Sequence, residues 1–258
     1  MSALLETCHL TREFGGLRAI GDLSIAVKRG EILGIIGPNG AGKTTLFNLL
    51  TGIYPPSYGD ILFDGRSITG LQPSRIARLG MARTFQNIRL FRQLSVLENV
   101  RIAYDSGLAC SPLDAMLRSP RALLRERESV EASMELLEMF QLGSHVEDRV
   151  GDLSYGAQRR LEIVRALALK PTLLLLDEPA AGMNPSEAMQ LTDFLRWVHD
   201  KFSLTIVLIE HHMQMVMALC DRIEVIEFGV RIAGGKPEDV KADPRVIEAY
   251  LGTEGELP

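Results

Sequence analysis

The chain has 258 residues, of which 46% are hydrophobic and 24% are charged, so it can form one or two globular lobes with a sizeable core. Its net charge of −5 provides no basic field for nucleic acid, which we do not expect as a partner. Three separated cysteines, Cys8, Cys110 and Cys220, indicate neither a disulfide framework nor a zinc site, and a reducing cytosol fits them best. No apolar run approaches the ~20 residues that span a bilayer, so work at a membrane would require another subunit.

Strand-like patterns occupy both ends of the chain. Short β-type runs at residues 24–27 and 61–63, bounded by glycine or charged residues, predict a small antiparallel part. Apolar runs at residues 173–176, 205–209 and 223–226 alternate with helical patterns. Such alternation predicts an α/β fold, with a mostly parallel sheet that carries helices on its faces.

The middle of the chain, from about residue 72 to residue 151, is predicted to be mostly helical. Apolar residues recur there at helical spacing among Arg and Glu, which predicts an amphipathic helix. These residues are Leu123, Leu124, Val130, Met134, Leu137 and Phe140. Glycine and proline within residues 106–120 indicate a connection or a short helical insert.

A glycine-rich stretch at residues 37–45 carries the clearest chemical signal, because it follows the apolar, strand-like run 32–36 and leads into a helix near Gly42. Glycines let successive N–H groups face an anion, and the helix adds its positive N-terminal end. Lys43 can then reach the β and γ phosphates of ATP, and the Thr44 hydroxyl can bind the accompanying Mg²⁺. The stretch therefore predicts a phosphate-binding loop rather than a turn with a solvated lysine. Its residues are Gly37, Pro38, Asn39, Gly40, Ala41, Gly42, Lys43, Thr44 and Thr45.

Two carboxylates follow the apolar run 173–176. The ends of strands in α/β sheets are where ligands bind, so Asp177 is suited to hold magnesium through its waters. Glu178 can orient or polarise the attacking water. Alone, such a pair is more often a solvated turn or a helix cap, but the phosphate loop favours the catalytic interpretation.

Residues 153–161 read Leu-Ser-Tyr-Gly-Ala-Gln-Arg-Arg-Leu and lead into a predicted helix, for which Ser154 is a typical N-cap. The segment also resembles the signature motif of ABC-type ATPases, although Tyr155 and Ala157 stand where the general pattern has glycine and glutamine. The resemblance implies that Ser154 and Gly156 bind the γ phosphate of an ATP held by a second subunit across a dimer interface.

Other residues match the same family at corresponding positions. Phe14 resembles the aromatic that stacks on adenine, although the residue alone fits a core phenylalanine equally well. Gln86 matches the glutamine that links the catalytic core to the helical subdomain and contacts magnesium or water. His211 matches the histidine at the γ phosphate and is favoured over His212, which stands where aspartate is usual. The resemblance thus makes Lys43, Glu178 and His211 the expected catalytic residues, and Thr44, Gln86 and Asp177 the expected metal contacts.

The resemblance covers essentially the whole chain and implies a single ATP-binding cassette. Its fold would be a phosphate-loop NTPase core with a small antiparallel β part and a helical subdomain. Residues 1–86 and 160–258 are expected to form the core, and residues 87–159 the helical subdomain with the signature motif.

A finer likeness connects the chain to the ATP-binding subunits of branched-chain amino acid uptake transporters, in particular the first of the two such subunits. It rests on residues 14–17, 82–91, 154–156, 159–163 and 248–252. It implies a subunit at the cytoplasmic face of the membrane, bound to an integral membrane permease and served indirectly by a substrate-binding protein. The working dimer would be a homodimer or a heterodimer with a related ATPase subunit.

Three alternatives to this assignment stay open at the level of sequence. Close relatives energise urea or short-chain amide uptake, or lipopolysaccharide extraction, so the resemblance leaves these cargoes open. Soluble ABC ATPases without a permease usually carry two cassettes or long coiled coils, which this sequence lacks. A small-molecule kinase with the same loop would not explain the signature motif or His211.

Overall fold

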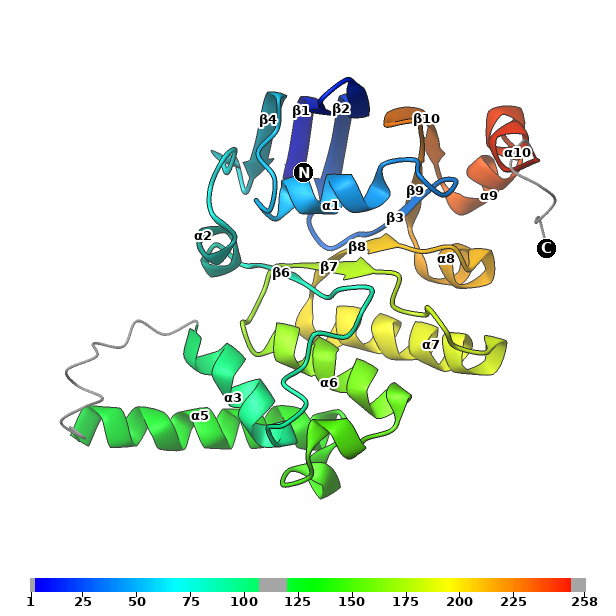
Figure 1. Cartoon of the computed structure of the whole chain (residues 1–258). Coiled ribbons are helices and arrows are strands. Elements are labelled where there is room, and N and C mark those ends of the chain that lie inside the picture. Colours follow the sequence, from blue (N-terminus) through cyan, green and yellow to red (C-terminus); the bar gives the residue numbers. More distant parts are fainter. Residues whose placement is uncertain (1–2, 107–119, 252–258) are drawn as a thin grey trace. The chain divides into compact units, whose positions relative to one another are not determined.

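The computed structural model describes residues 3–106 and 120–251 (Figure 1), so residues 107–119 of the expected connection lie outside the described residues. The chain divides into two compact units, of which the second is Thr84–Pro171 and the first is the rest. The boundary expected at residue 160 falls inside helix α6 (Tyr155–Leu167), which belongs entirely to the second unit. Among the described residues, no helix combines the length and the apolar character that crossing a bilayer requires.

The first unit contains a four-stranded antiparallel sheet with the order β2-β1-β4-β5. Its strands are β1 (Ala3–Phe14), β2 (Leu17–Lys28), β4 (Tyr58–Phe63) and β5 (Arg66–Ser67). The predicted runs at 24–27 and 61–63 lie in β2 and β4, which confirms the antiparallel part. The sequence analysis did not predict β1, whose pairing with β2 shifts register several times and so interrupts the alternation of buried and exposed residues.

A six-stranded sheet with the order β10-β9-β3-β8-β7-β6 completes this unit. Five of the strands are parallel, and only β10 runs antiparallel to its neighbour. The strands are β3 (Ile32–Ile36), β6 (Met81–Arg83), β7 (Leu173–Asp177), β8 (Thr205–Ile209), β9 (Arg222–Glu227) and β10 (Val230–Gly235). The predicted α/β class is therefore confirmed. The helical prediction was wrong for β6, because pairing with β7 determines the conformation of a strand too short to show its own period.

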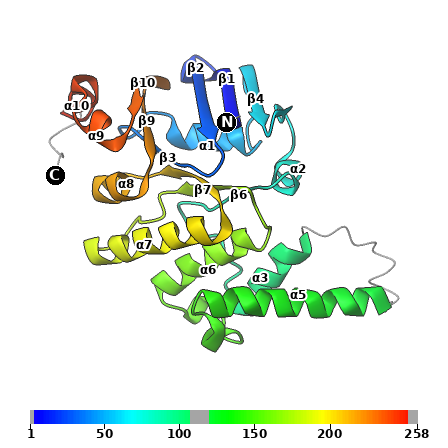
Figure 2. The same cartoon turned by 180° about the vertical axis from the view of Figure 1, so that it is seen from behind.

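Helices cover both faces of the six-stranded sheet in the first unit. They are α1 (Lys43–Leu50), α2 (Pro73–Arg78), α7 (Pro185–Phe202), α8 (Met213–Leu219), α9 (Pro237–Lys241) and α10 (Pro244–Leu251). Figures 1 and 2 show α1 between the two sheets, with α7 and α8 on the opposite side of the six-stranded sheet. This arrangement places the start of α1 at the edge where the parallel strands end.

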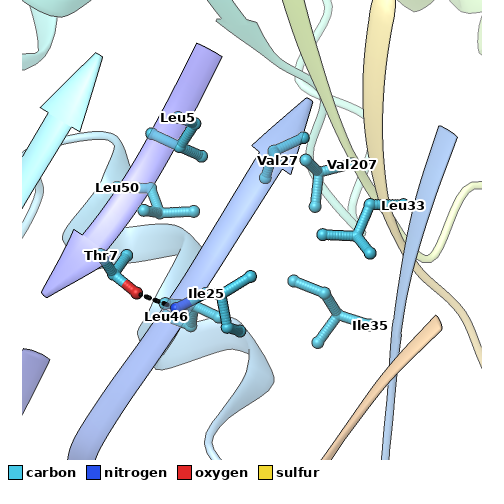
Figure 3. A pocket seen from close by; sticks show the side chains of 9 residues that line it. All are labelled: Leu5, Thr7, Ile25, Val27, Leu33, Ile35, Leu46, Leu50 and Val207. Atoms are coloured by element: carbon cyan, nitrogen blue, oxygen red, sulfur yellow. Dashed lines mark hydrogen bonds between the residues drawn. The ribbon is translucent and has the colours of Figure 1, made fainter. Parts of the chain in front are cut away.

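The core between the two sheets is apolar and contains one small cavity that Figure 3 shows from close by. The polar group at its wall, the Thr7 hydroxyl, accepts a hydrogen bond of 2.9 Å from the Ile25 N–H, so it is satisfied there. The lining residues are Leu5, Thr7, Ile25, Val27, Leu33, Ile35, Leu46, Leu50 and Val207. The cavity belongs to the core that holds α1 in place.

The second unit is built from helices α3 (Val96–Ser106), α5 (Pro120–Met139) and α6, with short 3₁₀ turns at Gly143–His145 and Val150–Asp152. The predicted amphipathic helix corresponds to α5. Leu137 is buried, as is Phe140 just beyond the helix end. Leu123 and Leu124 are exposed, so the predicted apolar stripe is covered only along the later turns of the helix.

Candidate functional site

The predicted phosphate loop connects β3 to α1. Gly42 is the N-cap of α1 with φ of 99°, and a Cβ at this position would lie 2.5 Å from the carbonyl oxygen of Ala19. A Cβ on Gly37 would lie 1.9 Å from the carbonyl oxygen of Ile226. Only glycine fits at both ends of the loop, since any side chain would clash with backbone. The chain therefore places a tight loop and a helix N-terminus together, as anion binding requires.

The Lys43 side chain lies over its own loop. Its Nζ donates hydrogen bonds to the carbonyl oxygens of Gly37 at 2.6 Å and Pro38 at 2.8 Å, and the residue is buried. Burial lowers the pKa of Lys43 to about 8, and the nearby carboxylates of Glu178 and Asp177 act in the opposite direction. Phosphate oxygens beside Lys43 would therefore stabilise the charged form of its side chain.

ATP binding is expected to weaken by about tenfold between pH 7 and pH 9. The Lys43 pKa of about 8 in the free chain means that the side chain is mostly charged at pH 7 and mostly neutral at pH 9. Phosphate favours the charged form and raises this pKa in the complex, so binding above pH 8 takes up a proton. Isothermal titration calorimetry in two buffers of different ionisation enthalpy measures both effects. A Lys43→Met variant is the control, and a pH dependence that survives in it would contradict the assignment.

Tyr250 of α10 also lies at the start of the loop. Burial raises the pKa of the Tyr250 phenol to about 12, and a hydrogen bond with the backbone of Gly37 acts in the opposite direction. The C-terminal helix therefore contacts the phosphate loop, and the sequence analysis noted Tyr250 only as a mark of the subfamily.

The carboxyl ends of β3, β6, β7 and β8 meet at one edge because these strands are parallel neighbours. Asp177 is the last residue of β7, is buried, and pairs in register with Ile209 of β8. Glu178 follows with φ of 45°, and its N–H donates to the Ile209 carbonyl oxygen at 2.9 Å. Left-handed backbone is uncommon for a residue with a side chain, and such conformations concentrate at functional sites. The two predicted carboxylates therefore lie at this edge, close enough to Lys43 to affect its pKa.

His211 lies within hydrogen-bonding distance of Glu178. The distance from His211 Nε2 to Glu178 Oε1 is 2.8 Å, and both side chains are partly accessible. His212 instead has its Nδ1 3.1 Å from the buried carboxylate of Glu210. The structure thus joins His211, and not His212, to the predicted catalytic carboxylate.

Glu210 is a residue of this site that the sequence analysis missed. Its carboxylate accepts hydrogen bonds from the backbone N–H groups of Ala180 at 2.7 Å, His211 at 2.8 Å and His212 at 3.1 Å. It therefore holds the loop after β7 and the loop after β8 together. The signal was available, because Glu210 follows a buried strand just as Glu178 does.

Arg83 is a second missed residue, at the end of β6. Its guanidinium donates to Asp177 Oδ2 at 2.7 Å and to Asn48 Oδ1 at 2.8 Å. The sequence analysis used Arg83 only as part of the likeness at residues 82–91, because a long-range ion pair leaves no local pattern.

Phe14, the last residue of β1, is partly exposed and is therefore not the core phenylalanine that the sequence alone also allowed. Its ring meets the Tyr54 ring edge-on, with 5.4 Å between centroids. The Arg12 guanidinium lies 4.5 Å from the Phe14 ring centroid. An aromatic surface is thus available on the same unit as the phosphate loop.

The remaining predicted residues, Gln86, Ser154 and Gly156, belong to the second unit. Ser154 is the N-cap of α6, and its hydroxyl accepts a hydrogen bond of 3.4 Å from the Ala157 N–H, which confirms the predicted cap. A Cβ on Gly156 would meet no atom within 4 Å. The carbonyl oxygen of Gln86 accepts a hydrogen bond of 3.2 Å from Arg159.

The described residues fit a magnesium nucleotide by their chemistry. Thr44, in the first turn of α1, is exposed, and Asp177 ends the neighbouring strand β7, so both can offer oxygen ligands at this edge. Oxygen is the ligand that Mg²⁺ prefers, and the cation usually keeps several waters.

Comparison with known proteins agrees with this geometry. Residues 20–181 match the ABC transporter family, and residues 230–256 match a family described as branched-chain amino acid ATP-binding cassette transporter. The chain is 43% identical to the high-affinity branched-chain amino acid transport ATP-binding protein BraF of Pseudomonas aeruginosa, covering 96% of this chain and 98% of that protein. It is 42% identical, with the same coverage, to the corresponding protein LivG of Escherichia coli K12.

A solved structure of an ATP-binding cassette of an ABC transporter in its ADP conformation is also similar. It has 32% sequence identity and a TM-score of 0.85, and the match covers 98% of this chain and all of that one. A nucleotide-free cassette of an ABC transporter, with the same identity, has a TM-score of 0.83. By its sequence, its fold and the residues at the ends of its parallel strands, the chain belongs to the ABC transporter family.

Proposed function

We propose that this chain is the ATP-hydrolysing subunit of an ABC importer for branched-chain amino acids. The assignment of the cargo rests on one observation. The chain is 42–43% identical, over 96% of its length, to proteins named for branched-chain amino acid transport. The match of residues 230–256 supports the same assignment from a different part of the chain.

The first unit would bind the magnesium nucleotide. Backbone N–H groups of the phosphate loop and Lys43 would hold the β and γ phosphates, and Phe14 would stack on adenine. Thr44 and Asp177 would hold Mg²⁺, with Gln86 as a further contact to the metal or to water. When bound, the cation neutralises charge that develops on the phosphate oxygens.

Glu178 would orient the attacking water and accept a proton from it. Its 2.8 Å contact with His211 supports this role, because the imidazole can hold the carboxylate in one orientation. A neutral His211 has one N–H to donate, so it can serve either Glu178 or the γ phosphate.

A complete site would require two copies of the cassette. We assign Ser154 and Gly156 to the γ phosphate of ATP bound by a second ATPase subunit, which is either another copy or a related chain. The Ser154 cap at the N-terminus of α6 supports this, since helix N-termini attract anions. Hydrolysis would remove the phosphate that both faces share and so reopen the dimer.

The subunit would act at the cytoplasmic face of the membrane through an integral membrane permease, with a substrate-binding protein as an indirect partner. The segment from Asn87 to Val100 is our candidate for the permease contact. Its Phe91 side chain is half exposed, and aromatic residues are enriched at protein interfaces.

Uptake of labelled leucine tests the cargo. We expect uptake to fall to background in cells that carry Glu178→Gln as the only copy, because transport requires hydrolysis by this subunit. Glu238→Gln, an exposed change on α9, is the matched control and should leave uptake unchanged. Permease abundance is measured in all strains.

Normal leucine uptake in the Glu178→Gln cells, together with lost ATP hydrolysis by the purified variant, would contradict the branched-chain assignment and leave the ATPase assignment intact. Uptake of labelled urea and short amides, and lipopolysaccharide export, would then be measured in the same strains. These are the alternative cargoes that the sequence analysis left open.

A further inference from the structure

Arg83 connects two elements of the first unit that carry the candidate magnesium ligands. Its Nη2 donates to Asp177 Oδ2 at the end of β7, at 2.7 Å. Its Nη1 donates to Asn48 Oδ1 of α1 at 2.8 Å and to Oγ1 of Thr51, the C-cap of the same helix, at 3.2 Å. The guanidinium also lies 5.4 Å from the ring centroid of Phe47 on the same helix. One planar group therefore joins the end of β7 to α1.

The side chains that Arg83 contacts follow the candidate metal ligand Thr44 along the helix. Asn48 and Thr51 follow Thr44 by four and seven positions, so the three residues share one face of the helix. Bonds to Asn48 and Thr51 thus fix this face relative to Arg83. The bond to Asp177 fixes the carboxylate relative to the same group.

These bonds of Arg83 to Asp177, Asn48 and Thr51, which we call the Arg83 bridge, are buried and involve a charged pair. The Arg83 and Asp177 side chains are each 5% exposed, so water competes little for their hydrogen bonds. Arg83 donates to Oδ2 of Asp177, so this bond leaves the second carboxylate oxygen, Oδ1, for another ligand. A lysine would keep the charge, but it lacks the rigid fork that lets arginine bond partners on two sides.

We propose that Arg83 is a positioning residue for magnesium: it fixes the Asp177 carboxylate at a set distance from the Thr44 face of α1, with Oδ1 left for the hydrated cation. This inference rests on the proposed magnesium role of Thr44 and Asp177. Arg83 does not touch the metal or the phosphates. It acts through the two elements that it joins.

The test compares ATP affinity with Mg²⁺ and with EDTA, measured by isothermal titration calorimetry on the purified chain. We expect Arg83→Lys to reduce the gain in affinity that Mg²⁺ provides by about tenfold, because a misplaced ligand loses most of its contribution. Affinity in EDTA should be unchanged, since Lys43 and the phosphate loop remain. Arg75→Lys is the matched control, because Arg75 is exposed on α2.

Three outcomes would overturn the inference. A normal Mg²⁺ gain in Arg83→Lys would show that the Arg83 bridge does not position a ligand. An equal loss of affinity with and without Mg²⁺ would show a structural role only. If Mg²⁺ gives no gain in the wild type, or if Asp177→Asn keeps the full gain, the inference fails together with the proposed metal site. A gain that is lost in Asp177→Asn but kept in Arg83→Lys overturns the inference alone.

Discussion

Replacement of Glu178 by glutamine is expected to lower kcat for ATP hydrolysis by about 10²–10⁴-fold while ATP affinity stays close to that of the wild type. Glutamine keeps the shape of the side chain but cannot accept the proton of the attacking water. The left-handed backbone of Glu178 and its hydrogen bond to the Ile209 carbonyl oxygen remain, so the loop should keep its conformation. Steady-state kinetics and calorimetry with ATP measure the two quantities separately.

The same Glu178→Gln variant should form a more persistent dimer in ATP, because the phosphate that both subunits would share is not removed. Size-exclusion chromatography with ATP and with ADP checks this. Glu238→Gln on α9 again serves as the control. Normal turnover in Glu178→Gln would rule out the carboxylate as the base. A variant that also loses ATP affinity would point to misfolding of the loop instead.

Replacement of Arg159 by methionine is expected to destabilise the second unit by about 3–5 kcal/mol. Arg159 and Glu162 of α6 form an ion pair of 2.7 Å in which both side chains are 1% exposed. Removal of the cation leaves the Glu162 carboxylate buried without its charged partner. Urea denaturation, followed by circular dichroism, measures the change in the free energy of unfolding.

The Arg159 prediction also has a local consequence in the second unit. Arg159 donates to the carbonyl oxygens of Phe85 at 3.0 Å and Gln86 at 3.2 Å, and Glu162 accepts from the Arg89 N–H at 3.3 Å. The pair thus holds the segment around Gln86 against α6. Hydrogen exchange at Phe85 and Arg89 should therefore become faster in the variant.

Two further variants make the Arg159 result interpretable. Arg159→Met combined with Glu162→Met removes both charges and should recover much of the lost stability, because apolar side chains can replace a buried pair. Arg127→Met, an exposed change on α5, should change stability by less than about 0.5 kcal/mol. A single Arg159→Met variant as stable as this control would contradict the prediction.

Much of the fold was predictable because its signals are periodic or local. The buried runs that became β7, β8 and β9 alternate with helical patterns, and this alternation correctly predicted the parallel sheet. Prediction failed at β6, whose strand conformation depends on its pairing with β7. It also failed for Leu123 and Leu124, since periodicity shows which face is apolar but not how far neighbouring helices extend along it.

The sequence by itself determined the phosphate loop, the carboxylates after β7 and the family, because each is carried by short motifs whose own residues are adjacent in the chain. Only the tertiary structure decided which side chains meet across the first unit. It joined His211 to Glu178, brought Glu210 to the loop after β7, and placed Arg83 between Asp177 and α1. These contacts connect residues at least thirty positions apart, so no local spacing encodes them. Buried charges must find partners when the sheet forms, and the order of its strands selects those partners.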